Sequence, residues 1–226
     1  MVGSHNHDRI LEAVTLLEGI EQATDLSVDE HALSQNPALT TIYTDFVLST
    51  LFPEGKLNEA LLLLQAALRS DPKSLDVRRV MASIQLSAGL YDQALDNCRY
   101  VLAVNPSFPV MDTECGRVEV QKGDIASGIA KFEKRGDAAA AWIGYAYATS
   151  GRRAEAEDLL KRKAVFPQQQ AIIYAGLGDK DRAFEAIERL AAINPGRAGF
   201  FLTFPELALL RDDPRVATLR KRLGLP

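Results

Sequence analysis

The sequence predicts an all-α fold made of about five helix pairs stacked side by side. Three observations carry this prediction. Glycines recur at regular intervals, small and large apolar residues keep fixed distances from them, and Asp-Pro or Asn-Pro pairs follow apolar helical stretches. The chain has 226 residues, 47% hydrophobic and 25% charged, which is enough to bury a core along such a stack.

The glycines give the period of the repeat and are expected to join the two helices of each pair. A tight turn between helices needs backbone freedom, which glycine supplies. The second helix ends where a proline follows Asp or Asn, because proline cannot continue the hydrogen-bond ladder. The glycines are Gly55, Gly89 and Gly123 at steps of 34 residues, then Gly151 and Gly178 at steps of 28 and 27; the prolines are Pro72, Pro106 and Pro195.

Apolar residues at fixed offsets from each glycine predict how the two helices pack. Small residues before and after the turn let the helices approach closely, and a larger residue one turn later fills the space behind them. The small residues five positions after the glycines are Ala60, Ala94, Gly128, Ala156 and Ala183. The larger residues nine positions after the glycines are Leu64, Cys98, Phe132, Leu160 and Ile187. The position seven before each glycine, where a small residue is usual, holds Leu48, Ala82, Gly116, Gly144 and Ala171.

This pattern resembles the tetratricopeptide repeat (TPR). The resemblance rests on Leu90–Ala94 with Asn105-Pro106, on Ala141–Tyr147 and on Gly178–Ala183, and it spans about residues 37–195. It implies a right-handed α-α superhelical solenoid of about five TPR helix pairs with N- and C-terminal capping helices. Repeat three loses its closing residues after Phe132, and repeats four and five are short. Leu48 and Gln85 also depart from the small and apolar residues usual at their positions.

The predicted division of the chain has three parts. Residues 1–36 form an acidic N-terminal tail with a capping helix or a degenerate repeat. The array occupies 37–195, with repeats at about 41–74, 75–108, 109–136, 137–163 and 164–195. Residues 196–226 form a helical cap, in which Val216, Leu219 and Leu223 share an apolar face among basic residues. This tail resembles the end of bacterial TPR arrays that follow regulator, adenylate-cyclase or kinase domains, so the chain is either a fragment of such a protein or an array that stands alone.

Composition and motifs exclude several classes of function. The net charge is −4 and no concentrated basic face is visible, which argues against a nucleic-acid partner. No apolar run is long enough for a membrane span, and the N-terminus lacks a secretory signal, so a cytoplasmic location is expected. No metal-ligand spacing, phosphate-binding loop or nucleophile motif occurs among the 3 His and 2 Cys residues or elsewhere. We therefore expect no catalytic residues, no metal and no cofactor.

The two cysteines are expected to be buried thiols. Cys98 falls on the second helix of repeat two and Cys115 on the first helix of repeat three, which should be neighbours. A cytoplasmic chain with two cysteines does not depend on disulfides, and free cysteine is among the most buried residue types. The side chains are predicted to lie close together and reduced.

The resemblance implies that the first helix of each pair lines a concave groove that binds a protein or an extended peptide. Aligning the repeats places twelve residues there: Asp45, Ser49, Phe52, Arg79, Ser83, Leu86, Thr113, Arg117, Val120, Tyr145, Thr149 and Ile172. Apolar side chains interleaved with two arginines indicate a recognition surface. The family's clamp for an acidic chaperone terminus needs asparagines where Ser49, Ser83 and Arg117 stand, so that ligand is not expected.

Several alternatives stay open at this point. Arg79 and Arg117 either bind a carboxylate of the partner or pair with Asp76 and Glu114 on their own helices. Trp142 and Tyr147 are expected to pack between repeats, whereas Tyr145 falls on a different face. The leading function is a non-catalytic bacterial scaffold for protein binding. The alternatives are a regulatory segment that binds a small ligand and controls a missing effector domain, and homo-oligomerisation through an exposed end.

Overall fold

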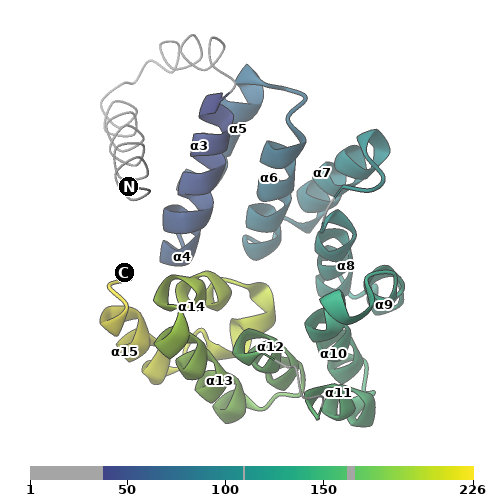
Figure 1. The fold of residues 1–226 in the computed structure, drawn as a ribbon, viewed down its shortest axis with the longest axis vertical. Helices are drawn as coiled ribbons and strands as arrows, with labels where there is room; N and C mark the ends of the chain where they lie inside the picture. Colours follow the sequence, from purple (N-terminus) through teal and green to yellow (C-terminus); the bar gives the residue numbers. More distant parts are fainter. Residues whose placement is uncertain (1–37, 109, 162–165) are drawn as a thin grey trace.

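The computed structural model describes residues 38–108, 110–161 and 166–226. In these ranges the chain is helical and carries no strand, so the predicted all-α solenoid is confirmed. Figure 1 shows the helices following one another around an arc, with α7, α9 and α11 outside α6, α8 and α10. The predicted N-terminal cap within residues 1–36 lies outside the described residues.

Within the described ranges, five pairs of helices follow in chain order. The first pair consists of one long helix, divided into α3 (Ala38–Phe46), the π-helical turn η1 (Val47–Leu51) and α4 (Phe52–Glu54), and of α5 (Leu57–Ser70). The next pairs are α6 (Leu75–Ser87) with α7 (Tyr91–Val104), α8 (Met111–Gln121) with α9 (Ile125–Glu133), α10 (Ala140–Thr149) with α11 (Arg153–Leu160), and α12 (Pro167–Gly176) with α13 (Lys180–Ile193). A short 3-10 helix, η2 (Gly136–Ala139), precedes α10.

The glycines between the helices adopt the conformation that the repeat pattern predicts. Their φ angles are positive: Gly55 +81°, Gly89 +76°, Gly123 +95°, Gly151 +84° and Gly178 +74°. In this left-handed region a side chain with a Cβ is strained, so a glycine at each turn fixes where one helix ends and its antiparallel partner begins.

Two further glycines allow α8 and α9 to touch. A Cβ built on Gly128 would lie 2.4 Å from Val120 Cγ2 and 2.8 Å from the backbone oxygen of Gly116. A Cβ on Gly116 would lie 2.6 Å from Phe132 Cε1. These positions match the predicted pattern of small residues beside the turn, with the larger Phe132 behind them and 1% exposed. The close approach therefore depends on the missing side chains.

The sequence departure at Gln85 has a structural reason. Gln85 is buried between α6 and α7, where a second amide, that of Asn97, donates to its side-chain oxygen at 2.9 Å. Arg78 in turn donates to the oxygen of Asn97 at 3.2 Å, and Gln85 donates to Gln93 at 3.3 Å. A buried amide is stable when its partners are satisfied, so polar bonds replace the usual apolar contact here. At the other departure, Leu48, the helix adopts the π-helical turn η1.

The chain after the fifth pair turns inward. It contains α14 (Pro195–Leu202), the 3-10 helix η3 (Pro205–Leu210) and α15 (Pro214–Arg222). Helix α14 packs against α13 and also against α4 and η1 of the first pair, while η3 packs against α12 and α13. Figure 1 shows α14 directly beside α4. The last elements thus close the arc on the first ones.

The main hydrophobic core contains residues from both ends of the arc. One cluster includes Val47 and Phe52 of the first helix together with Phe201, Phe204 and Leu207 of the last segment. The predicted apolar face of the tail is present, because Val216 and Leu219 are buried in the same cluster and Leu223 packs against it. The segment therefore covers both the last repeat and the first helix. None of the described helices combines the length and apolar character that a bilayer span requires.

Candidate functional site

The residues predicted for the concave groove lie in three different environments. Phe52, Ser83, Leu86, Arg117, Val120 and Ile172 are buried; Arg79, Thr113 and Tyr145 are half-buried; Asp45, Ser49 and Thr149 are exposed. Residues 195–226, which we call the C-terminal segment, cover part of this surface. A partner-binding role for the twelve residues stays a prediction.

Arg117 forms the centre of the covered part. It extends from α8 and donates from Nε and Nη2 to the two carboxylate oxygens of Glu206 in η3, each at 2.8 Å. Both side chains are 2% exposed. Nη1 also donates to Glu114 at 3.2 and 3.3 Å, so the predicted pair on the same helix exists. The carboxylate of Glu206 comes from 89 residues further along the chain, and no repeat pattern indicated it.

The charge of Arg117 is held in an apolar environment. Burial by itself disfavours the charged form, but the charges and hydrogen bonds of Glu206 and Glu114 raise the pKa of Arg117 above its ordinary value. The guanidinium carbon lies 4.2 Å from the ring centre of Trp142 and 4.1 Å from that of Phe204. The planar cation is thus enclosed by two rings and paired with carboxylates at its edges.

Aromatic side chains of the C-terminal segment continue this contact toward the first helix. The ring centre of Phe200 lies 4.8 Å from that of Phe52, in an edge-to-face arrangement. Phe204 lies 5.9 Å from Phe52 on one side and 5.9 Å from Trp142 on the other. The ring centres of Phe200 and Phe204 lie 5.2 Å apart, so the end of α14 and the turn after it bring two neighbouring rings to the first helix.

Hydrogen bonds from side chains of the C-terminal segment to backbone oxygens hold the segment against α4. Thr203 Oγ1 donates to the backbone oxygen of Phe52 at 2.9 Å. Arg220 of α15 donates to the backbone oxygens of Pro53 and Glu54 at 3.3 and 3.0 Å. The carbonyls of Pro53 and Glu54 belong to the end of the first helix, where backbone oxygens lack partners within the helix. The carbonyl of Phe52 also accepts from the backbone N–H of Gly55 at 3.0 Å. Burial lowers the pKa of Arg220 below its ordinary value.

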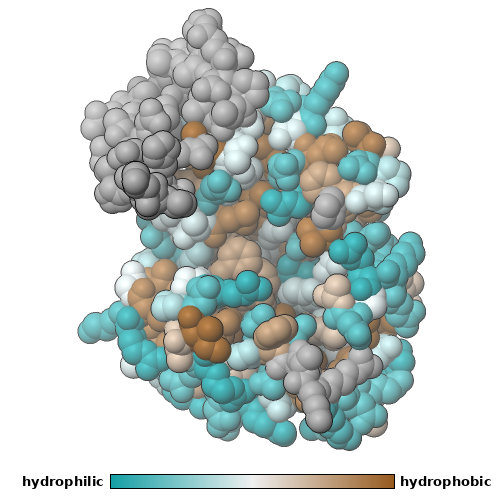
Figure 2. Space-filling model, in the orientation of Figure 1, coloured by the Kyte–Doolittle hydropathy of each residue, from teal (hydrophilic) through white to brown (hydrophobic). Residues whose placement is uncertain are grey.

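Part of the predicted groove stays open. Arg79 on α6 is 25% exposed at its side chain and lies 3.6 Å from Asp76, so the predicted pair on the same helix is present here as well. Asp45 and Ser49 on the first helix are exposed, and Thr113 on α8 is half-buried. Figure 2 shows hydrophobic residues toward the middle of this view of the molecule, with many hydrophilic residues around them.

The aromatic residues of α10 pack as expected. Trp142 contacts two core clusters and Tyr147 contacts a third one. The hydroxyl of Tyr145 lies 3.4 Å from Gln121 Nε2, which donates to it, and burial raises the pKa of Tyr145. A small cavity of about 220 Å³ lies at α9, η2, α10 and α11, with Glu133, Asp137 and Tyr147 among its lining residues.

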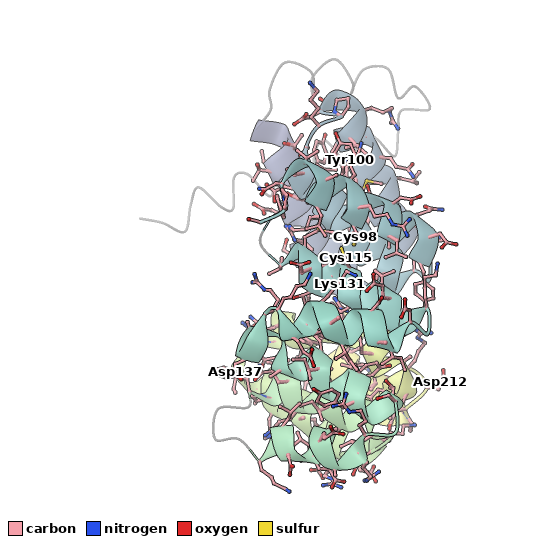
Figure 3. The ribbon with its side chains drawn as sticks, turned by 90° about the vertical axis from the view of Figure 1, so that its right-hand side faces the viewer. Cys98, Tyr100, Cys115, Lys131, Asp137 and Asp212 are labelled. Atoms are coloured by element: carbon pink, nitrogen blue, oxygen red, sulfur yellow. The ribbon has the colours of Figure 1, made fainter. Side chains whose placement is uncertain are left out.

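The two cysteines are free and buried, as predicted. They belong to one small core cluster formed by α6, α7 and α8, and Figure 3 shows Cys98 just above Cys115. A hydrogen bond with the neighbouring thiol and burial both raise the pKa of Cys98. Because the thiolate is the reactive form, this environment disfavours chemistry at Cys98.

Comparison with known proteins agrees with the repeat pattern. Residues 51–97 match the family model described as tetratricopeptide repeat. The chain is similar in structure to a tetratricopeptide repeat protein from Parabacteroides merdae, with a TM-score of 0.52 and 18% identity over 98% of this chain and 100% of that one. It is also similar to YrrB, described as a TPR protein with an unusual peptide-binding site, with a TM-score of 0.44 and 16% identity over 75% and 94% of the two chains. Among curated proteins no sequence match is found.

The fold, its turns and the family match lead to one conclusion. The helices form antiparallel pairs with a glycine of positive φ at each turn between partners. The family model matches the second helix of the first pair and its surroundings up to α7, and the P. merdae protein shares the fold along its whole length. Such a fold supports a protein-interaction scaffold in general. Residues 51–97 thus carry a tetratricopeptide-repeat match, and the described helices have the fold of a solved tetratricopeptide repeat protein.

Proposed function

We propose that the chain is a non-catalytic scaffold that binds a protein or an extended peptide on the concave face of its helical stack. The residues proposed to contact the partner are the exposed and half-buried ones on the first helices of the pairs: Asp45, Ser49, Arg79, Thr113, Tyr145 and Thr149. Fold alone does not define a binding surface, so the proposal must rest on the site.

One observation carries the proposal. The concave face already holds a peptide segment, because Arg117 and Trp142 contact Glu206 and Phe204 of the C-terminal segment. Phe204 and Glu206 lie after the five helix pairs, in a turn and a short 3-10 helix. A surface that combines a bidentate arginine with aromatic rings has the properties of a peptide site.

The open part of the face extends this surface. Arg79 is partly exposed and its pair with Asp76 joins groups at 25% and 74% exposure. An ion pair so close to water contributes little, and Arg79 can exchange it for a carboxylate of the partner. Asp45 and Ser49 lie on the neighbouring first helix and offer acceptors for an extended backbone.

The experiment pans a displayed peptide library against the wild-type chain, the Arg79→Glu variant and the Arg99→Glu variant. The two substitutions are matched, because each arginine pairs with an aspartate three residues earlier: Arg99 lies 3.4 Å from Asp96 on α7. Helix α7 is a second helix, outside α6. Stability of all three proteins is compared by thermal unfolding before panning.

The proposal predicts enriched peptides whose affinity falls at least tenfold with Arg79→Glu and stays within twofold with Arg99→Glu. Removing one charge-assisted hydrogen bond costs about 1.5–3 kcal/mol. Since about 1.4 kcal/mol is a factor of ten in affinity, the loss should be at least tenfold. Peptides that bind all three proteins equally would place the binding surface elsewhere. A library that yields no binder to the wild-type chain would contradict peptide binding on the open face.

A further inference from the structure

We propose that the covered part of the concave face is a binding site for a partner segment in which aromatic residues precede a carboxylate, and that the C-terminal segment is its resident competitor. The inference rests on the proposed function and adds the chemistry of the ligand and a control on access. Its basis is the sequence Phe200–Glu206, which fills the site in this chain.

The site defines the ligand by three contacts. One ring packs on Phe52, as Phe200 does; a second ring lies between Phe52 and Trp142, as Phe204 does; and a carboxylate two positions later pairs with Arg117. The two rings lie side by side, with their centres 5.2 Å apart, because the chain turns between them after the end of α14. An aliphatic segment would lose the ring contacts with the guanidinium, and one without an acid would leave Arg117 short of its bidentate partner.

The buried arginine explains why the site favours an acid-bearing segment. Arg117 is 2% exposed, so removing the C-terminal segment without a substitute would leave Glu114 as its carboxylate partner at 3.2 Å. A site built around a buried polar group rejects ligands that leave this group unpaired. The same requirement holds for the resident segment and for any segment that displaces it.

The resident segment lies after the repeats and must release its contacts with the first helix before a competing segment can bind. It follows α13 directly, and its contacts with the first helix include the Thr203 and Arg220 bonds, the Phe52 rings, the approach at Gly199 and burial in the same core cluster. A Cβ at Gly199 would lie 3.4 Å from Pro53 Cβ and 2.5 Å from Leu225 Cδ1. Competing ligands therefore need to replace a limited set of contacts that the structure itself displays.

The first experiment uses the chain's own segment as the probe. A fluorescein-labelled peptide of residues 195–212 is titrated into the wild-type chain and into full-length Glu206→Gln, with anisotropy as the readout. Glu185→Gln, an exposed residue on α13, is the matched control. The resident segment loses its charge-assisted bonds in Glu206→Gln, so the probe should bind this variant at least tenfold more tightly than wild type or Glu185→Gln.

A second probe tests the carboxylate. The same peptide with Glu206→Gln should bind the Glu206→Gln chain at least tenfold more weakly than the peptide that keeps the glutamate. Equal affinity of the two peptides, or equal affinity of the probe for all three chains, would overturn the inference.

A reversible lock provides an independent test. The full-length variant Pro53→Cys/Gly199→Cys/Leu225→Ala places two Cβ atoms near the separation that a disulfide requires, and the shortened residue 225 makes room. Added to Glu206→Gln, the oxidised lock should abolish probe binding, and reduction should restore it. The single-cysteine variants control for Cys98 and Cys115, which are buried. Probe binding to the locked chain would show that the peptide occupies another surface and overturn the proposal.

The outcomes separate this inference from the proposed function. Library peptides that depend on Arg79, with no lock-sensitive binding of the 195–212 probe, would leave the scaffold proposal standing and overturn the resident competitor. Lock-sensitive binding of the probe without any library binder would support this site and contradict the open face as the general binding surface.

Discussion

Replacing Glu206 by glutamine tests the energetic role of the pair that closes the arc. The substitution keeps the shape of the side chain and removes its charge, while Arg117 stays buried with two of its bonds weakened. Breaking a buried ion pair by removing one partner costs about 3–5 kcal/mol. Glu114 remains within 3.2 Å of Arg117 and offsets part of this cost, so the expected loss of unfolding free energy is about 2–3 kcal/mol.

The measurement is urea denaturation at pH 7 and 25 °C, followed by circular dichroism. Glu185→Gln should change the unfolding free energy by less than about 0.5 kcal/mol, because surface substitutions have small effects. The double variant Arg117→Met/Glu206→Leu removes both charges and should return to within about 1 kcal/mol of the wild type, because apolar residues of similar volume replace a buried pair at little cost. A loss below about 1 kcal/mol in Glu206→Gln would refute the reasoning, since it would mean that water reaches the pair.

Three further predictions concern the contact between α8 and α9, the reactivity of the thiols and the loss of stability at acidic pH. Gly128→Ala should lower the unfolding free energy by about 1–3 kcal/mol, because its Cβ meets Val120 and the Gly116 backbone; Gly196→Ala, whose Cβ would meet no atom closer than 3.9 Å, should change thermal stability little. Titration with a thiol reagent should detect no fast-reacting cysteine in the folded chain and two in denaturant; two fast thiols in the folded chain would contradict the burial of Cys98 and Cys115. Hydrogen bonds and charge from Arg215 lower the pKa of Asp213, so its contribution to stability is complete above its unfolded value of about 3.9 and is lost as pH falls below it. Asp213→Asn should therefore reduce the stability difference between pH 6 and pH 3, measured by urea unfolding, and an unchanged difference would exclude this carboxylate as a source.

The repeat elements could be predicted from sequence because their determinants are local. Gly89 and Gly123 take positive φ where the period places a turn, and Gly116 and Gly128 stand where two helices touch. The turns and the close helix contacts both depend on interactions within one helix pair, so they appear in the sequence as residues at a fixed spacing. The polar replacement at Gln85 could be located as a departure, but its partner Asn97 was not identified, since amide networks have no spacing rule.

The covered site could not be predicted because its contacts are not periodic. The resemblance placed Phe52 and Arg117 on the first helices, and the sequence indicated apolar and basic faces in the tail. Whether the tail reaches α4 depends on small rotations that accumulate from pair to pair along the stack. The total rotation along the stack cannot be inferred from any local sequence pattern, so Glu206 and Phe204 were not recognised as parts of the site. A run of three phenylalanines and a glutamate within seven residues, Phe200–Glu206, was the available signal.

The contact between α4 and α14 has a consequence for how this protein can vary in length. In an open array each unit touches only its neighbours, so units can be gained or lost at little cost to the rest. Here the first and last elements must meet, with Thr203 bonded to Phe52 and Arg220 to Pro53. Inserting or deleting one helix pair would carry α14 around the superhelix and away from α4. Closure therefore fixes the number of repeats, and it ties the first and last of the described helices into a single cooperative unit.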